Sequence, residues 1–197
     1  MKLLSDQVSE AEIKVILREL KKTRAISGEI VEFGCYVGTT SVFIASEIES
    51  WQNNKQLYLY DSFEGLPEKA VQDVNSLGVD FKKGELLATK KQLIQNLKKS
   101  NLKTMPRIKK GWFSELSKTD VPDKISFAFL DGDYYESIID PLNLIWDKLS
   151  EDAIIVVDDY QNQALPGAQI AVDEWCKKHN LTPKIEQTLA IFSKKLN

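Results

Sequence analysis

The sequence has little histidine, little cysteine and no long apolar run. Its single histidine, His179, lies at the expected end of a helix and far in sequence from the acidic clusters, which argues against a histidine base. The two cysteines, Cys35 and Cys176, have no metal-site spacing and are typical of structural residues in a reducing compartment. No apolar stretch approaches the roughly 18 residues that span a bilayer, and residues 1–6 lack the apolar core of a signal peptide. We therefore expect a soluble, cytoplasmic protein without a membrane partner.

Positive charge is not in excess either. The chain has 26 lysines and arginines against 29 aspartates and glutamates, a formal net charge of -3, which argues against binding of nucleic acid through its phosphates. Ser62 and Ser137 lack a histidine-acid constellation, so nucleophilic hydrolysis is disfavoured. The G-x-G-x-x-G pattern of dinucleotide-binding dehydrogenases is missing. Without a repeat or a linker, residues 1–197 are expected to form a single domain.

What the chain does have is acids at the ends of two apolar runs. Residues 125–130 break into Asp131-Gly132-Asp133, and residues 153–157 break into Asp158-Asp159. If both runs are parallel strands, their carboxyl ends meet at one edge of the sheet. Crowded carboxylates repel one another unless a cation or donor lies among them, and hard oxygen ligands suit magnesium, calcium or manganese rather than zinc. The pattern predicts a divalent metal site.

The periodicity of apolar residues predicts an α/β fold in which strands alternate with helices, as in a parallel three-layer sandwich. The expected helices cover residues 7–26, 39–46, 85–99, 138–149 and 167–178. The expected strands cover residues 29–33, 56–60, 105–110, 125–130 and 153–157, followed by a terminal hairpin of 184–189 and 190–195.

The turn after the first strand carries an acid and two glycines, in Glu32-Phe-Gly34-Cys-Tyr-Val-Gly38. A carboxylate there would oppose a pyrophosphate, whereas the amino acid part of S-adenosylmethionine suits it. The turn amides can hold its carboxylate while Glu32 lies near the ammonium or sulfonium. Asp61, at the end of the next strand, is suited to the ribose hydroxyls. The alternative is that Glu32 and Asp61 cap strand ends and face water.

Taken together, these motifs resemble the macrocin O-methyltransferase (TylF-type) family over residues 28–175. The family uses S-adenosylmethionine and magnesium to methylate sugar hydroxyls of natural products. The resemblance implies a Rossmann-like class I methyltransferase fold, with a mostly parallel seven-stranded sheet that ends in an antiparallel strand. The segments that carry it are 29–38, 60–67, 111–113, 130–137 and 156–160, which include Asp-Ser-Phe-Glu-Gly-Leu-Pro and Asp-Gly-Asp.

The resemblance also implies residue roles. Asp131, Asp158 and Asp159 would bind the metal, and Asp131 or Asp133 would take the proton of the acceptor hydroxyl, with Asp131 preferred. Trp112 is equally compatible with simple core packing. The residues expected to contact the cofactor are Glu32, Gly34, Tyr36, Gly38 and Thr39 for the methionine part, Asp61 for the ribose, Ser62, Phe63, Gly111 and Trp112 for the adenine, and Asp131.

Tyrosines flank the acids on both sides. Tyr134, Tyr135 and Tyr160 would either border the acceptor pocket or pack in the core. Pro166-Gly167 predicts a loop at the mouth of the cleft.

The acceptor is less well defined, because family members are larger and carry extra segments for a lid and a dimer contact. The expected partner is a small-molecule hydroxyl acceptor, a glycoside, and the resemblance allows a homodimer. Two alternatives stay open. One is a catechol-type O-methyltransferase acting on a vicinal aromatic diol, and the other is a nucleotide- or sugar-binding α/β module without catalysis.

Overall fold

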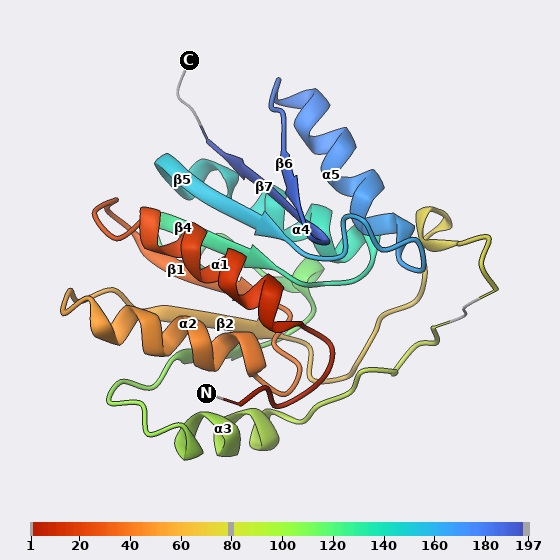
Figure 1. Ribbon diagram of the computed structural model, residues 1–197. Coiled ribbons are helices and arrows are strands. Elements are labelled where there is room, and N and C mark those ends of the chain that lie inside the picture. Colours follow the sequence, from red (N-terminus) through yellow and green to blue (C-terminus); the bar gives the residue numbers. More distant parts are fainter. Residues whose placement is uncertain (1, 79–80, 195–197) are drawn as a thin grey trace.

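The computed structural model describes residues 2–78 and 81–194, which form a seven-stranded sheet flanked by helices (Figure 1). None of the helices in these two ranges is long and apolar enough to cross a membrane. The elements in chain order are α1 (Glu10–Lys22), β1 (Glu29–Phe33), α2 (Thr39–Ser50), β2 (Leu57–Asp61), the 3-10 helix η1 (Val71–Asp73), α3 (Lys90–Lys99), β3 (Arg107–Lys110), η2 (Phe113–Glu115), β4 (Ile125–Leu130), α4 (Tyr135–Ile145), η3 (Trp146–Lys148), β5 (Leu149–Val157), α5 (Pro166–Lys178), β6 (Lys184–Glu186) and β7 (Leu189–Ser193).

The strands lie in the order β3-β2-β1-β4-β5-β7-β6. β1 to β5 pair in parallel, whereas β7 is antiparallel to β5 and β6 is antiparallel to β7. The order reverses between β1 and β4, because the chain moves outward from β1 to β3 and then returns to the other side of β1. Open α/β sheets bind ligands beyond the carboxyl ends of the strands at such a reversal.

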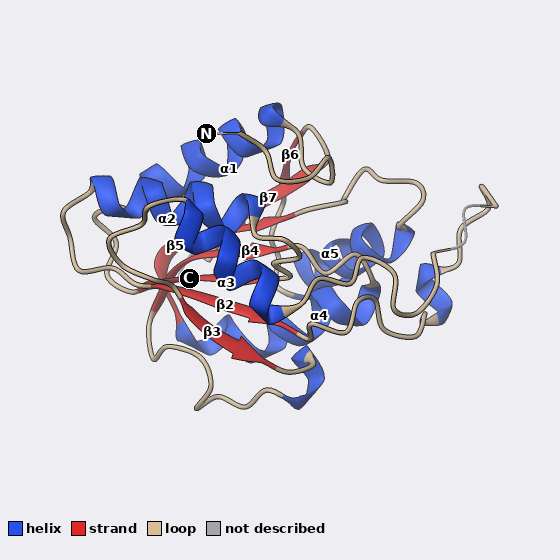
Figure 2. Cartoon of the chain, turned by 90° about the horizontal axis from the view of Figure 1, so that it is seen from below, coloured by secondary structure: helices blue, strands red, loops and turns tan. Residues whose placement is uncertain are grey.

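Alternate residues of each strand face opposite layers, because the side-chain period of a strand is two. Ile30 and Phe127 pack with α1, α2 and α3, whereas Val31 and Ala128 pack with α4 and α5 (Figure 2). All six residues of β4 are buried, as expected for a central parallel strand covered on both faces. The observed layers confirm the predicted α/β sandwich and its antiparallel terminal strand.

The predicted strands are all present among the described residues, and β4 has the predicted bounds. Three helix starts were wrong. α3 begins at Lys90 rather than residue 85, because Thr89 caps it, its side chain accepting from Gln92 N–H. α1 begins at Glu10 rather than residue 7, because Ser9 and Glu12 form a capping box. α4 begins at Tyr135 rather than residue 138, without a local side-chain cap, and β5 begins at Leu149 rather than residue 153. The predicted end of the last strand, Lys195, lies outside the described residues.

Candidate active site

The carboxyl ends of β1, β2, β4 and β5 border a cavity of about 330 Å³. Each of these strands is followed by a turn that contributes to the lining. Tyr36 follows β1, Ser62 follows β2, Asp131 and Asp133 follow β4, and Asp159 follows β5. The cavity therefore lies at the reversal of strand order, and its polar side chains come from segments far apart in the sequence.

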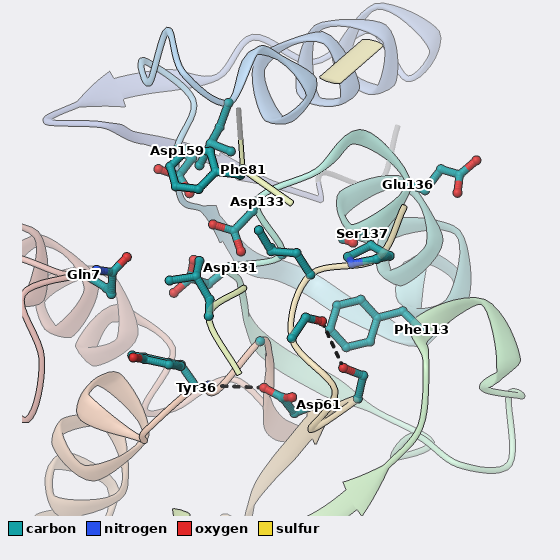
Figure 3. Close-up of a pocket in the computed structure, with 18 of the residues that line it drawn as sticks. Gln7, Tyr36, Asp61, Phe81, Phe113, Asp131, Asp133, Glu136, Ser137 and Asp159 are labelled. Carbon is teal, nitrogen blue, oxygen red and sulfur yellow. Dashed lines mark hydrogen bonds between the residues drawn. The ribbon is translucent and has the colours of Figure 1, made fainter. Parts of the chain in front are cut away.

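Asp61 and the turn after β1 form one hydrogen-bonded unit. Asp61 Oδ2 accepts from the backbone N–H of Tyr36 at 3.1 Å (Figure 3) and of Cys35 at 2.8 Å. Asp61 Oδ1 accepts from Phe63 N–H at 2.7 Å. A carboxylate offers about four acceptor positions, so about one remains for a ligand. The expectation that the turn amides hold a ligand carboxylate was wrong for Cys35 and Tyr36, because Asp61 engages both.

Gly34 allows the turns after β1 and β4 to touch. Its φ is +87°, and an added Cβ would lie 1.8 Å from the carbonyl oxygen of Asp131. Asp131 N–H in turn donates to the Phe33 carbonyl at 2.8 Å. A side chain at residue 34 would therefore displace the backbone that carries Asp131. Glycine at position 34 is therefore required by the contact between the turns after β1 and β4.

Glu32 lies beneath the turn and is outside the cavity lining. Its side chain is 1% exposed, and Oε2 has no hydrogen-bond partner. Burial, together with the nearby charge of Asp61, raises the pKa of Glu32 to about 8. A buried carboxyl oxygen without a donor is costly, so a donor or a cation close to the turn would stabilise it.

The acids after β4 and β5 gather on one side of the cavity (Figure 3). One carboxylate oxygen from each of Asp131, Asp133 and Asp159 lies within 4.8 Å of the other two. Burial raises the pKa of Asp131 and of Asp133 well above the usual range, and the neighbouring aspartates raise both further. Among the described residues, no lysine, arginine or histidine forms an ion pair with these acids. The oxygen set and its unbalanced charge fit a hard divalent cation.

Asp158 is close to this group but has partners of its own. Its Oδ1 accepts from the Thr188 hydroxyl at 3.0 Å and from Asp159 N–H at 2.8 Å. Thr188 also contacts Glu12 of α1. Burial raises the pKa of Asp158 to about 8, and among neighbouring charges Asp158 acts most strongly on Asp131. Asp158 is therefore part of the same electrostatic cluster, although it does not line the cavity.

Strained backbone accompanies these side chains. Tyr36, Phe63, Asp133 and Asp159 all have φ between 44° and 64°, in the left-handed region. Aspartate tolerates this region, but an aromatic residue there costs free energy that the surrounding structure must offset. Each of these four residues follows the carboxyl end of a strand, and three of them, Tyr36, Asp133 and Asp159, line the cavity.

The predicted site residues divide into two sets. Those that line the cavity are Gly34, Tyr36, Asp61, Ser62, Trp112, Asp131, Asp133 and Asp159. Those that lie behind the lining are Glu32, Gly38, Thr39, Phe63, Gly111 and Asp158.

Sequence reasoning missed part of the cavity wall. Asp6 and Gln7 line it because the chain is not yet helical there, and the Ser9-x-x-Glu12 pattern could have revealed that. Phe81 and Leu86, from the long connection between β2 and α3, also line it, without a periodic pattern to mark them.

The flanking aromatic residues have structural contacts outside the lining. The Tyr135 hydroxyl donates to Glu174 and the Tyr160 hydroxyl to Asp173, at 2.7 and 2.8 Å.

His179 is the C-terminal cap of α5, as predicted. Its ring centroid lies 4.3 Å from that of Trp175. Pro166-Gly167 forms the first turn of α5, so the predicted loop at this position was wrong.

Comparison with known proteins agrees with this geometry. The family model described as Macrocin-O-methyltransferase (TylF) matches residues 10–194. The chain belongs to this family. The TylF match confirms the resemblance drawn from the Asp-Ser-Phe-Glu-Gly-Leu-Pro and Asp-Gly-Asp segments. The O-methyltransferase NovP has the same fold, with a TM-score of 0.77 at 22% identity, covering 93% of this chain and 79% of that structure.

Two curated relatives of this TylF chain come from Streptomyces. The 8-demethyl-8-(2,3-dimethoxy-alpha-L-rhamnosyl)-tetracenomycin-C 4'-O-methyltransferase of Streptomyces olivaceus is 25% identical over 168 residues, or 82% of this chain and 63% of the relative. The demethyldecarbamoylnovobiocin O-methyltransferase of Streptomyces niveus is 24% identical over 165 residues, or 81% of this chain and 62% of the relative. The chain thus spans less than two thirds of the length of either relative.

Proposed function

We propose that this protein transfers a methyl group from S-adenosylmethionine to a hydroxyl of a sugar or a sugar-containing natural product, with the help of a divalent metal ion. The observation that carries the proposal is the group of buried carboxylates beside the cavity, in a chain of the TylF family. The names of the two Streptomyces relatives support the acceptor class, since one includes a rhamnosyl group.

The cofactor would lie along the turns after β1, β2 and β3. Asp61 keeps about one acceptor position for a ribose hydroxyl, and Tyr36 and Ser62 line the same part of the cavity. Trp112 offers a ring face for the adenine. Glu32, beneath the turn, would stabilise the positive charge near the methionine end, because its Oε2 lacks a donor. S-adenosylmethionine supplies the methyl group from a sulfonium in an in-line displacement.

The metal would be held by Asp131 and Asp159. The third ligand has two candidates. Asp133 has an oxygen in the same close group, whereas Asp158 is the residue that the family resemblance implies. A divalent ion there would orient vicinal hydroxyls and lower the pKa of the one that reacts. Substitution of Asp133 or Asp158 by asparagine, compared by Mg²⁺ titration calorimetry, distinguishes the two ligand sets.

Removal of the acceptor proton falls to a carboxylate of the cluster. Asp131 and Asp133 both line the cavity, where a carboxylate can accept the proton of a bound hydroxyl. Asp131 is preferred, because the turn after β1 fixes its backbone directly next to the cofactor side.

The test is transfer of a deuterated methyl group from labelled S-adenosylmethionine to p-nitrophenyl α-L-rhamnopyranoside, with 3,4-dihydroxybenzoate as the competing acceptor. We expect a mass shift on the rhamnoside that EDTA abolishes and Mg²⁺ restores. Faster methylation of the dihydroxybenzoate would favour the alternative hypothesis of a catechol-type O-methyltransferase. Tight cofactor binding without transfer to any hydroxyl compound would favour a binding module.

A further inference from the structure

A second buried carboxylate, Asp73 of η1, lies outside the acid cluster. Its side chain is 2% exposed. Asp73 Oδ1 accepts from Tyr135 N–H at 2.7 Å, and Oδ2 accepts from Ala70 N–H at 2.8 Å. Tyr135 is the first residue of α4, and the preceding residue provides no side-chain cap. Asp73 therefore caps α4 from 62 residues away in sequence, where a negative charge also suits the helix dipole.

Gly167, the second residue of α5, makes room for this carboxylate. A Cβ at Gly167 would lie 1.8 Å from Asp73 Oδ1 and 2.7 Å from Tyr135 N. Gly167 is not one of the glycines with positive φ, so it is required for space rather than for backbone conformation. Glycine in a helix costs about 1 kcal/mol relative to alanine, which the close contact must offset. η1, α4 and α5 thus converge on one carboxylate.

The segment that Asp73 anchors forms an apolar wall of the cavity, made of Leu66, Phe81 and Leu86. The two ends of the segment pair through their backbones, with Leu66 N–H donating to Glu85 O at 2.8 Å and Gly84 N–H donating to Leu66 O at 2.9 Å. The hydroxyl of Tyr134, which directly precedes Tyr135, donates to the Phe81 carbonyl at 3.2 Å. The wall is therefore fastened to the same turn that carries Asp131 and Asp133.

We propose that Asp73 is a positioning residue for the acceptor. It holds the apolar wall at a fixed place relative to the acids of the turn after β4, without itself lining the cavity. This role rests on the proposed function. The acceptor would lie between the wall and the acids, whereas the cofactor side is built on the turns after β1, β2 and β3, so loss of Asp73 affects the acceptor selectively.

Two substitutions disturb the contact from opposite sides. Asp73→Asn keeps the volume but turns a donor toward one of the two N–H groups, and Gly167→Ala drives a methyl group into Oδ1. We expect both to raise the KM for p-nitrophenyl α-L-rhamnopyranoside by about tenfold or more, the usual effect of a lost hydrogen bond to a charged group. The affinity for S-adenosylhomocysteine, measured by calorimetry, and kcat should stay within about twofold.

Hydrogen–deuterium exchange provides a readout that does not need turnover. We expect both variants to exchange faster at residues 81–86 and at Tyr135, while β1 and α2 keep their protection. Asp123→Asn is the matched control, since Asp123 is fully exposed and pairs with Lys148 on the surface. Asp123→Asn should change neither the KM for the rhamnoside nor the exchange at residues 81–86 and Tyr135.

An unchanged KM and unchanged exchange at residues 81–86 in the variants would overturn the proposal. If Asp73→Asn lowers the melting temperature but leaves the KM and the exchange of residues 81–86 unchanged, Asp73 is only a helix cap. If the wild-type protein methylates no rhamnoside, the proposed acceptor class fails, and exchange at residues 81–86 still decides whether Asp73 holds the wall. Should Asp73→Asn not fold, Gly167→Ala carries both measurements.

Discussion

Buried polar groups are paired at the amino ends of the parallel strands, here called the amino edge of the sheet, but among the described residues several lack a basic partner at the carboxyl ends, the carboxyl edge. At the amino edge, Lys55 Nζ donates to the carbonyls of Ile26 and Gly28 at 2.5 and 2.6 Å and to Ser126 Oγ at 2.8 Å. Ser126 Oγ also lies 3.1 Å from the Gly28 carbonyl oxygen. Each polar group in this cluster has a partner, and the cluster ties the start of β1 to the start of β4.

At the carboxyl edge, carboxylates face one another. Asp131, Asp133 and Asp159 share a space without a basic partner among the described residues, and Glu32 Oε2 lacks a donor. A buried lysine could neutralise such carboxylates, and at the amino edge Lys55 does supply a buried donor. Among the described residues, the unpaired carboxylates at the carboxyl edge therefore suit the proposed divalent cation, whereas the paired groups at the amino edge contribute to stability.

Substitution in the acid cluster should have the largest effect. We expect Asp131→Asn and Asp159→Asn to reduce methyl transfer by about 10² to 10⁴-fold, the range for loss of a general base or charged ligand, with unchanged cofactor affinity. Both variants should also melt at a higher temperature in EDTA, because one repelling charge is gone. Steady-state kinetics and thermal melts check this. Retained activity in both variants would remove the cluster from the reaction.

Substitution at the amino edge should lower stability and leave activity unchanged, the reverse of the effect expected in the acid cluster. Lys55→Met removes a donor shared by two carbonyls and a hydroxyl, and among the described residues only the Gly28 carbonyl keeps another donor, Ser126, so we expect a loss of about 3 kcal/mol in the free energy of unfolding. Urea denaturation measures it. Activity per folded molecule should be unchanged. A loss of activity without a loss of stability would break the contrast between the edges.

The pH dependence of stability sharpens the comparison further. Burial raises the pKa of Glu32 and Asp158 to about 8, so the folded protein binds more protons than the unfolded chain between about pH 4 and pH 8. Stability should therefore fall as pH rises through this window in EDTA, because both carboxyls lose their protons in the folded protein there. Mg²⁺ should offset the fall at pH 8 more than at pH 5.

Thermal melts across this window decide the point, with Asp158→Asn expected to flatten the profile. Glu186, whose pKa the neighbouring Arg18 lowers to about 2, acts with the opposite sign but only below about pH 4.5. A metal-free protein that becomes more stable from pH 5 to pH 8 would contradict the raised pKa values.

The sequence predicts what depends on local pattern. β4 was found at its bounds because a run of six residues, apolar except for Ser126, ends in Asp131-Gly132-Asp133, and the acids of β4 and β5 were correctly expected at one edge. Contacts between distant segments were not predictable. No local signal shows that Asp73 caps α4 or that Asp61 engages the amides of Cys35 and Tyr36.

Only part of the cavity lining could be predicted from the sequence. Its floor follows from strand ends, which the periodicity defines, whereas Phe81 and Leu86 come from a connection without regular spacing. Glu32 is buried because β1 lies between β2 and β4, and this pairing of strands that are distant in sequence is not a local sequence pattern.

The most direct measurement is an anomalous difference map from crystals grown with S-adenosylhomocysteine and soaked in Mn²⁺. We expect a single strong peak at about 2.2 Å from oxygens of Asp131 and Asp159, with Asp133 or Asp158 as the third protein ligand. A map without a peak in the acid cluster, from crystals that hold the cofactor, would contradict it.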